Sequence, residues 1–498
     1  MFGHLDFLIT LSFALFAFRS AASDNGLART PAMGWNTWNA FGCDVSEELL
    51  LQTARKITDY GLQDAGYHYI VLDDCWSAGR TANGSLKVDT TKFPNGMRHV
   101  AGQLHDMGFG FGMYSDAGKM TCGKYMGSLG YERIDAQTFA NWHVDYLKYD
   151  NCYNEGQSGT PLITYNRYKV MSNALNTTGR SILYSVCNWG EDYPWKWGQT
   201  MCNSWRMSGD LTDSFDRPDT RCPCTGDEGY DCALPGFHCS AMNVLNKVTG
   251  FVDKGIPGSW NDLDMLQVGN GGMSDDEYKI HFSMWAAVKS PLLMGNDIRS
   301  MSVSTLSILS NPAVLAISQD PSGSSAVRRW RYFVNDTDEF GQGEIQMWSG
   351  SLDNGDEVVA LVNAGNEART MNATLRDIFW DDGGKSSSNT QAAATWDVYD
   401  LWANRMSDSV ASQIISNGNN NLTIASNDTL VNAVNGTYYN ATAISYAQGL
   451  ANNDTRLFGE YVTRVQGLGT ITTQVPRHGI SLMRLRQVSS STRKRNEL

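Results

Sequence analysis

The sequence has no long run of basic residues in its interior. Its 39 lysines and arginines are outnumbered by 52 aspartates and glutamates, which gives a formal net charge of −13. A chain with this balance offers little attraction to nucleic acid or to an anionic membrane, so we expect neither as a partner. The basic end Ser491–Leu498 is short, and we interpret it as a solvated tail.

Long apolar runs are missing after the first twenty residues, which excludes a membrane-spanning helix in the rest of the chain. Near the start, Phe7–Phe18 is apolar but too short to span a bilayer, and the small residues Ser20–Ser23 follow it. This pattern predicts a signal peptide over residues 1–22, although His4 and Asp6 make the first residues atypical. We therefore expect a secreted, extracellular protein.

Cysteine is absent after residue 239. In an oxidising compartment an even number of cysteines favours disulfides. The segment Cys222–Cys239 allows a zinc knuckle or two local disulfides, and since only His238 accompanies it, we favour disulfides and leave their connectivity open. The ten cysteines are Cys43, Cys75, Cys122, Cys152, Cys187, Cys202, Cys222, Cys224, Cys232 and Cys239.

Sequons for N-linked glycosylation agree with export. We predict glycosylation sites at Asn83, Asn176, Asn335, Asn372, Asn421, Asn427, Asn435, Asn440 and Asn453.

The 498 residues are more than one compact core usually holds. Between residues 27 and 322 eight short apolar runs end in polar residues and alternate with helix-like segments, which predicts a parallel (β/α)8 barrel, with a doubly wound open sheet as the alternative. In the first helical segment we expect a cap at Asp44 with Glu47, and Leu50, Ala54 and Ile57 on one face.

From residue 323 to 490 the sequence pattern changes to short strand-like runs separated by Gly, Asn and Asp. This predicts a C-terminal antiparallel β-sandwich domain. Within it an Asn-rich stretch, about residues 410–455, is crowded with sequons, and we interpret it as a glycosylated surface excursion.

The segment Asp145–Cys152 alternates like a half-buried strand. Tyr146, Lys148 and Asp150 share one face, and Leu147 and Tyr149 point the other way. A lysine and an aspartate on one strand face indicate either a structural ion pair or a site where a carboxylate must stay ionised.

Carboxylates and aromatic rings collect at the ends of the predicted strands, where a barrel of this kind has its working residues. Hydroxyl acceptors beside flat rings suit a sugar. A Mg²⁺ or Ca²⁺ site at Asp73 and Asp74 is the alternative, but adjacent strand residues point to opposite faces, and Lys148 and Arg206 supply positive charge. We therefore predict neither a metal nor a cofactor.

Six motifs occur in one order along the predicted barrel: RTPAMGWNTWNAFGC, VLDDCW, YSDAG, YLKYDNC, SWRMSGD and WNDLDML. Together they resemble glycoside hydrolase family 27, the secreted α-galactosidases (melibiases) of the fungal type. The resemblance implies a retaining O-glycosidase that removes terminal α-D-galactosyl residues from oligosaccharides or galactomannans. It also implies that Asp150 is the nucleophile and Asp210 the general acid and base, with their carboxyls roughly 5 Å apart.

The same resemblance implies the substrate contacts. Asp73 and Asp74 would accept bonds from the 4- and 6-hydroxyls, and Lys148 would donate to hydroxyls and favour ionised Asp150. The remaining contacts are Trp38 and Tyr114 at the apolar sugar face, Arg206 and Asp264 near C2, and Met265, Cys187 and Trp189 in the pocket wall. The implied disulfides are Cys43–Cys75, Cys122–Cys152 and Cys187–Cys202.

Alternatives stay open at this level. Relatives that accept N-acetylgalactosamine have small residues after strand five, whereas this chain has Trp189, so we favour galactose over an α-N-acetylgalactosaminidase. A β-L-arabinopyranosidase, a catalytically inactive galactose-binding protein and a structural surface glycoprotein are the other candidates. Both candidate catalytic carboxylates are present, which argues against the last two.

Overall fold

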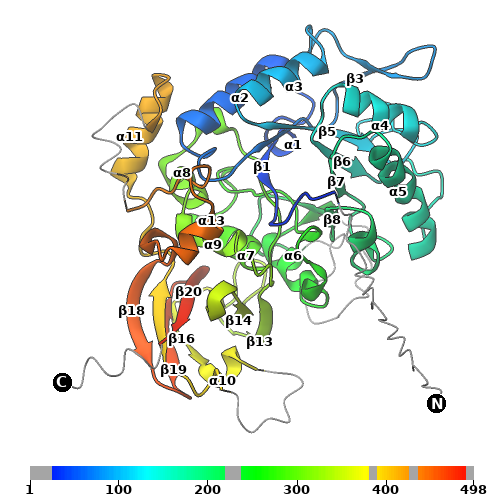
Figure 1. The fold of residues 1–498 in the computed structure, drawn as a ribbon. Coiled ribbons are helices and arrows are strands. Elements are labelled where there is room, and N and C mark those ends of the chain that lie inside the picture. Colours follow the sequence, from blue (N-terminus) through cyan, green and yellow to red (C-terminus); the bar gives the residue numbers. More distant parts are fainter. Residues whose placement is uncertain (1–24, 219–236, 381–389, 425–433, 435, 489–498) are drawn as a thin grey trace, which may run out of the picture.

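The computed structural model describes residues 25–218, 237–380, 390–424, 434 and 436–488 (Figure 1). The predicted signal peptide lies outside the described residues. Eight parallel strands form the first sheet, in the order β11-β8-β7-β6-β5-β2-β1-β12. They are β1 (Met33–Asn36), β2 (Tyr69–Val71), β5 (Gly110–Asp116), β6 (Tyr146–Asp150), β7 (Leu183–Val186), β8 (Ser204–Arg206), β11 (Trp260–Asp262) and β12 (Leu292–Met294).

The sheet closes on itself next to β11 and β12. The Leu266 amide, just after β11, donates to the Leu293 carbonyl at 2.7 Å, and the Gly295 amide donates to the Leu266 carbonyl at 3.0 Å. Closure leaves no edge strand, so the predicted barrel is confirmed and the open sheet is excluded.

Helices cover the outside of the barrel, as the alternating pattern predicted (Figure 1). In α2, Leu50, Ala54 and Ile57 are fully buried. The predicted cap at Asp44 is wrong, because the Ser46 hydroxyl accepts the Leu49 amide at 3.2 Å. The helices are α1 (Trp38–Phe41), α2 (Glu47–Asp59), α3 (Met97–Asp106), α4 (Glu132–Asn141), α5 (Pro161–Asn176), α6 (Ala241–Val248), α7 (Asp275–Ala287), α8 (Val303–Leu309) and α9 (Pro312–Ser318).

Short elements fill the connections around the barrel. Two 3₁₀ turns, η1 (Pro194–Lys196) and η2 (Gly198–Thr200), join β7 to β8. A hairpin of β3 (Ser77–Arg80) and β4 (Leu86–Val88) follows β2, and β9 (Asp210–Leu211) pairs with β10 (Phe237–Cys239) after β8. The other 3₁₀ turns are η4 (Val252–Lys254) and η5 (Ile298–Ser300). None of the helices in the described ranges is both long and apolar enough to cross a membrane.

The C-terminal domain consists of antiparallel sheets, as predicted, and packs beside the barrel (Figure 1). In β15, Val359 and Leu361 enter the core of the sandwich, whereas Val358 and Val362 pack into the barrel's core. The larger sheet, in order, is β13 (Val327–Phe333), β14 (Glu344–Ser351), β15 (Glu357–Asn363), β20 (Gly479–Gln487), β17 (Trp396–Asp400) and β18 (Glu460–Val465), and β16 (Arg369–Thr374) pairs with β19 (Thr470–Val475). The remaining elements of this part are η6 (Asp353–Gly355), α10 (Leu375–Ile378), α11 (Asp408–Asn419), α13 (Tyr446–Ala451) and η8 (Thr455–Leu457).

The described part of the Asn-rich insertion does not project outward as an excursion. Its helix α11 packs against α2 and α8 of the barrel. The buried Tyr446 hydroxyl donates to the Ala65 carbonyl at 2.9 Å, and the Lys56 ammonium donates to the Gly418 carbonyl at 2.5 Å. The described part of the insertion therefore folds back onto the barrel, and this correction follows from contacts between residues more than 300 positions apart.

The predicted sequons lie mostly on the surface. Asn440 is half-buried, and Asn427 and Asn435 lie outside the described residues. Asn83, Asn176, Asn335, Asn372, Asn421 and Asn453 are exposed.

Two of the three expected disulfides are present, Cys43–Cys75 and Cys122–Cys152. The third is wrong, because Cys187 and Cys202 are buried free thiols. Ser185 of β7 pairs with Ser204 of β8, so Cys187 follows the carboxyl end of one strand and Cys202 precedes the amino end of its neighbour. Four residues of strand rise separate the two levels by about 13 Å, beyond the reach of a disulfide.

The clustered cysteines are described only in part. Cys239 is disulfide-bonded. Cys222, Cys224 and Cys232 lie outside the described residues.

Candidate active site

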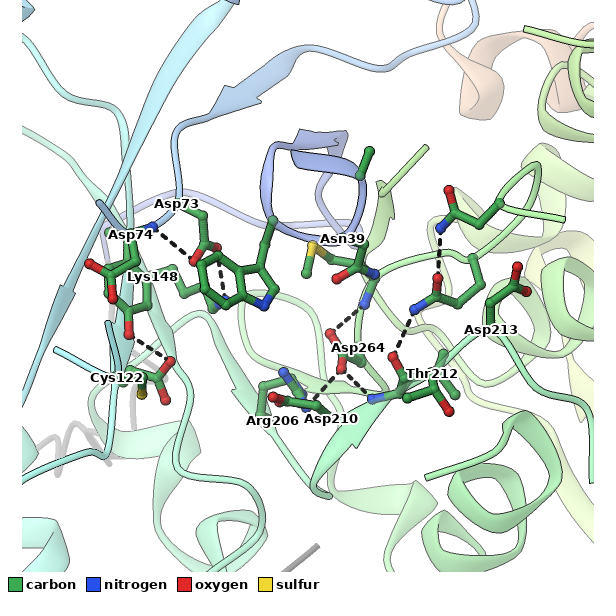
Figure 2. A pocket seen from close by; sticks show the side chains of 18 of the residues that line it. Asn39, Asp73, Asp74, Cys122, Lys148, Arg206, Asp210, Thr212, Asp213 and Asp264 are labelled. Carbon is green, nitrogen blue, oxygen red and sulfur yellow. Dashed lines mark hydrogen bonds and ion pairs between the residues drawn. The ribbon is translucent and has the colours of Figure 1, made fainter. Parts of the chain in front are cut away.

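A cavity of about 790 Å³ opens at the carboxyl ends of the barrel strands (Figure 2). It brings together every predicted sugar contact except Cys187, along with both candidate catalytic carboxylates. Its lining includes Trp38, Asp73, Asp74, Tyr114, Lys148, Asp150, Trp189, Arg206, Asp210, Asp264 and Met265.

Asp150 ends β6 and is 6% exposed. One carboxylate oxygen accepts the Tyr114 hydroxyl at 3.0 Å, and the other accepts the Asn151 amide at 3.0 Å. Burial raises the pKa of Asp150 to about 6, the charge of Lys148 acts to lower it, and the charge of Asp210 raises it further. Two donors thus hold the carboxylate, but its burial makes ionisation cost energy.

Lys148 lies on the same strand face as Asp150, as predicted, but its nearest carboxylate is Asp73. The Lys148 ammonium is 2.8 Å from Asp73 Oδ2, which also accepts the Asn36 side-chain amide at 2.8 Å. The simple ion pair between Lys148 and Asp150 is therefore not the arrangement found. Lys148 acts on Asp150 through the field of its charge, and the Asp73 charge keeps the ammonium protonated by raising its pKa.

Asp73 and Asp74 both line the cavity. Their side chains do not point to opposite faces, as adjacent strand residues would, because β2 ends at Val71 and the backbone turns, with φ of +72° at Cys75. Asp74 accepts the Cys75 and Gly123 amides, each at 2.7 Å, and the Thr121 hydroxyl at 2.9 Å. Loop donors therefore hold this carboxylate at the cavity wall.

Arg206, at the end of β8, lies between two carboxylates (Figure 2). Its Nη2 is 3.0 Å from Asp210 Oδ1 and 2.8 Å from Asp264 Oδ2. Asp264 also accepts the Leu211 amide at 2.8 Å and adopts a left-handed φ of +83°. A non-glycine residue in this conformation stores strain of order 1–3 kcal/mol, a feature common at functional sites. Asp210 is 44% exposed, so it stays open to water.

The loop after β7 carries Trp189 into the cavity wall in a left-handed conformation, with φ of +59°. The Asn151 side chain, next to Asp150, donates to Glu191 at 2.8 Å and ties this loop to the end of strand β6. Cys187 lies behind the wall instead of in it. It is 1% exposed, and Nη1 of Arg206 lies 3.7 Å from its sulfur, so it supports Arg206 and does not reach a sugar.

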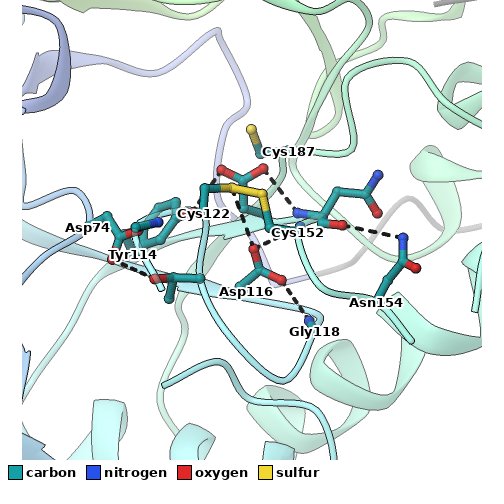
Figure 3. The surroundings of a disulfide bond; sticks show 12 residues. Asp74, Tyr114, Asp116, Gly118, Cys122, Cys152, Asn154 and Cys187 are labelled. Atoms are coloured by element: carbon teal, nitrogen blue, oxygen red, sulfur yellow. Dashed lines mark hydrogen bonds between the residues drawn. A yellow bond between two sulfur atoms is a disulfide. The ribbon is translucent and has the colours of Figure 1, made fainter. Parts of the chain in front are cut away.

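The Cys122–Cys152 disulfide stands beside the cavity, with Cys122 in the lining, as the family resemblance implied (Figure 3). Asp116 accepts the Gly118 amide at 2.6 Å and the Cys152 amide at 3.0 Å. The Asp116 carboxylate and the two sulfurs lie within 4.8 Å of one another, a spacing that a metal site would also show. Because the sulfurs are bonded to each other they are not thiolate ligands, and we assign the group to bracing the loop.

Several lining residues were not predicted. Gln267 is the most informative, because its side chain donates to the Leu211 carbonyl at 2.7 Å and its backbone amide donates to His281 Nε2 at 3.0 Å. It thereby holds β9, the strand that begins with Asp210. The sequence offered one signal for Gln267, which is that it directly follows the motif WNDLDML. The other unpredicted lining residues are Asn39, Ala40, Leu211, Thr212, Asp213, Gly269, Asn270 and Ser300.

A closed barrel that gathers carboxylates, hydroxyl acceptors and flat aromatic rings at the carboxyl ends of its strands defines a glycoside hydrolase. Comparison with known proteins narrows the class. The chain matches the family model of α-galactosidase A over residues 30–221 and 240–320, and that of the α-galactosidase C-terminal β-sandwich domain over residues 342–434.

Individual relatives agree over nearly the whole length. An α-galactosidase of Lachancea cidri is 57% identical over 467 residues, which covers 94% of this chain and 96% of the relative. The structure of a Saccharomyces cerevisiae α-galactosidase with raffinose has a TM-score of 0.88 and 56% identity, covering 94% of this chain and 100% of the other. α-Galactosidase I of Mortierella vinacea gives a TM-score of 0.75 and 43% identity, with 93% and 98% covered.

The chain therefore belongs to the α-galactosidase (melibiase) family, glycoside hydrolase family 27. Its activity is the removal of terminal α-galactosyl residues from galactosides.

Proposed function

We propose that the chain hydrolyses terminal α-D-galactosides with retention of configuration, through a covalent galactosyl-enzyme on Asp150. The observation that carries this proposal is the meeting of Asp150 and Asp210 in one cavity with the hydroxyl acceptors Asp73 and Asp74. No step needs a metal or another cofactor.

In the first step a carboxylate oxygen of Asp150 attacks C1 of the sugar. The bond from C1 to the leaving oxygen breaks, and Asp210 gives its proton to that oxygen. In the second step ionised Asp210 takes a proton from water, the water oxygen bonds to C1, and Asp150 leaves as a carboxylate. Two inversions at C1 restore the α configuration.

The surroundings of the two carboxylates suit these roles. Asp150 receives hydrogen bonds from Tyr114 and Asn151 on its two oxygens, which stabilise the anion and orient it. Asp210 is partly exposed beside Arg206, where water for the second step has access.

Recognition of galactose is assigned to the polar wall. We propose that Asp73, Asp74 and Lys148 bind the 4- and 6-hydroxyls, and that Arg206 and Asp264 bind the hydroxyl at C2. Trp38 and Tyr114 pack on the apolar sugar face, Met265 completes the wall, and Trp189 occupies the space that an acetamido group would need. All of these residues line the cavity.

We also propose that the protein acts outside the cell, after removal of a signal peptide at residues 1–22. The predicted glycosylation sequons and the disulfides Cys43–Cys75 and Cys122–Cys152 fit that route. The proposed partners are α-galactoside carbohydrates, and we assign it neither a nucleic-acid nor a membrane partner. The domain limits proposed are 27–322 and 323–490, with β13 beginning at Val327 after helix α9.

The test is hydrolysis of p-nitrophenyl α-galactoside beside p-nitrophenyl α-N-acetylgalactosaminide by the wild type, Asp150→Asn and Asp106→Asn. Asp106 is exposed at the end of α3 and serves as the matched control. We expect turnover of the galactoside alone, lost by about 10³-fold or more in Asp150→Asn and unchanged in Asp106→Asn. Preference for the acetamido sugar would overturn the role of Trp189, and an active Asp150→Asn would overturn the nucleophile.

A further inference from the structure

A second cavity, of about 720 Å³, lies on the C-terminal domain. Strands β17 and β18 contribute Tyr399 and Tyr461, and the segment after α13 contributes Asn453, Arg456 and Phe458. None of these residues lines the active-site cavity. The proposed catalytic function leaves this hollow unexplained.

The walls of this second cavity combine aromatic rings with charged groups. Tyr399 and Tyr461 meet edge to face, with centroids 5.8 Å apart, and Tyr461 is 52% exposed. The Arg486 guanidinium lies 4.0 Å from the Phe458 ring centroid. An accessible ring beside guanidinium and carboxylate groups, with Glu460 also in the lining, is the chemistry that binds a pyranose.

One lining residue is itself an attachment point for sugar. Asn453 begins the sequon Asn453–Thr455 and is exposed. Its side-chain oxygen accepts a hydrogen bond from Arg486 Nη2 at 3.0 Å. This bond fixes the plane of the amide and leaves the nitrogen Nδ2, the atom that carries an N-linked glycan, free of that contact at the cavity wall.

The backbone around Asn453 is equally fixed. Asn453 has a left-handed φ of +56°, and its amide donates to the Leu450 carbonyl at 3.1 Å. The next residue, Asp454, accepts Nε of Arg456 at 2.9 Å and caps the 3₁₀ turn η8. A glycan attached here therefore leaves from a rigid point beside the exposed ring of Tyr461.

We propose that Asn453 carries an N-linked glycan whose first sugar residues lie in this second cavity against Tyr461. Attachment forms a bond between Nδ2 and C1 of the oligosaccharide, Nδ2 loses one proton, and the lipid diphosphate that carried the oligosaccharide leaves. The proposal rests on the secretory route proposed above, because that donor is met there. A free oligosaccharide from outside is the competing occupant.

The experiment uses the full chain secreted from a glycosylating eukaryotic host. Glycopeptide mass spectrometry gives occupancy at Asn453 and at Asn176, an exposed sequon at the end of α5 that serves as the control. Enzymatic removal of glycans from the native protein is then followed at both sites. We expect both to be occupied and release from Asn453 to be about tenfold slower, a difference that denaturation removes.

Two variants identify the wall that shields the glycan. Tyr461→Ser should bring native release at Asn453 up to the rate at Asn176, and Tyr461→Phe, which keeps the ring, should not. Equal native rates at both sites, an unoccupied Asn453 beside an occupied Asn176, or binding of added oligosaccharide in the second cavity of the wild type would overturn the proposal. Two bare sites would overturn the proposal as well, whereas a chain that stays inside the host cells would refute the secretory route itself.

Discussion

Asp150 and Asp210 have opposite requirements in one cavity, since one must be an anion when the other holds a proton. Burial and the neighbouring carboxylates raise the pKa of Asp150 to about 6, against the opposing charge of Lys148. One of these carboxylates is Asp210, so its negative charge makes Asp150 harder to ionise, and a proton on Asp210 favours the Asp150 anion. The pair with one proton is the form that the proposed first step needs.

This pairing predicts the pH dependence of the enzyme. Asp150 must be ionised to attack C1, so kcat/KM for melibiose should fall by about tenfold per pH unit as the pH drops below about 6. The measurement is kcat/KM between pH 3 and 8, with a stability check at each pH. A value that keeps rising toward pH 8 would contradict the assignment of Asp210 as the acid.

The sequence predicted which side chains line this site better than it predicted which residues they contact. Asp150, Lys148 and Arg206 could be found because each ends a short apolar run within a recognisable motif. That Lys148 contacts Asp73 depends on the turn after Val71, and that Cys187 supports Arg206 depends on strand register. Neither contact can be inferred from the spacing of residues within a motif.

At the scale of elements, the proposed acid, Asp210, belongs to a strand of only two residues. β9 contains only Asp210 and Leu211, and Leu211 is bonded on both sides, by Gln267 at its carbonyl and by Asp264 at its amide. Propensity alone could not predict so short a strand, and tertiary hydrogen bonds define it.

Gln267→Ala should therefore impair the acid step more than binding. Loss of one buried hydrogen bond, about 1–1.5 kcal/mol, predicts about a tenfold lower kcat on melibiose with KM nearly unchanged. Aryl galactosides, whose leaving group needs no proton, should lose less in the first step. The control is Gln137→Ala on the surface of α4, and an equal loss on both substrates would refute a positioning role.

The predicted elements agree with the structure where a local pattern fixes them. All eight barrel strands were placed by apolar runs ending in polar residues, and α2 by its apolar face. The cap of α2 was placed two residues early because Asp44 and Ser46 are both good caps, and only the hydrogen bond from Leu49 selects Ser46.

At the scale of the whole molecule, the insertion joins the C-terminal domain back to the outside of the barrel. Tyr60 donates to Asn419 at 3.1 Å, and Tyr438 donates to Asp64. Composition predicted an exposed excursion because asparagine and sequons dominate the stretch. Composition did not predict that tyrosines would dock this stretch onto the barrel.

Tyr446→Phe tests this docking. The variant leaves the Ala65 carbonyl without its donor, which should cost about 1–2 kcal/mol and lower Tm by about 2–4 °C. Thermal unfolding measures the effect, with Tyr332→Phe on the exposed strand β13 as the control. Activity at 25 °C should be unchanged in both, and a Tm equal to that of the wild type would show that the contact adds nothing.

The most direct test of the proposed mechanism is the anomer formed when azide replaces the missing carboxylate. In Asp150→Ala, azide should attack C1 of p-nitrophenyl α-galactoside directly and give β-galactosyl azide. In Asp210→Ala, Asp150 should still form the galactosyl-enzyme, and azide should then release α-galactosyl azide. The opposite pairing of variants and anomers, or turnover in Asp150→Ala without azide at the rate of the wild type, would contradict the roles assigned to these two residues.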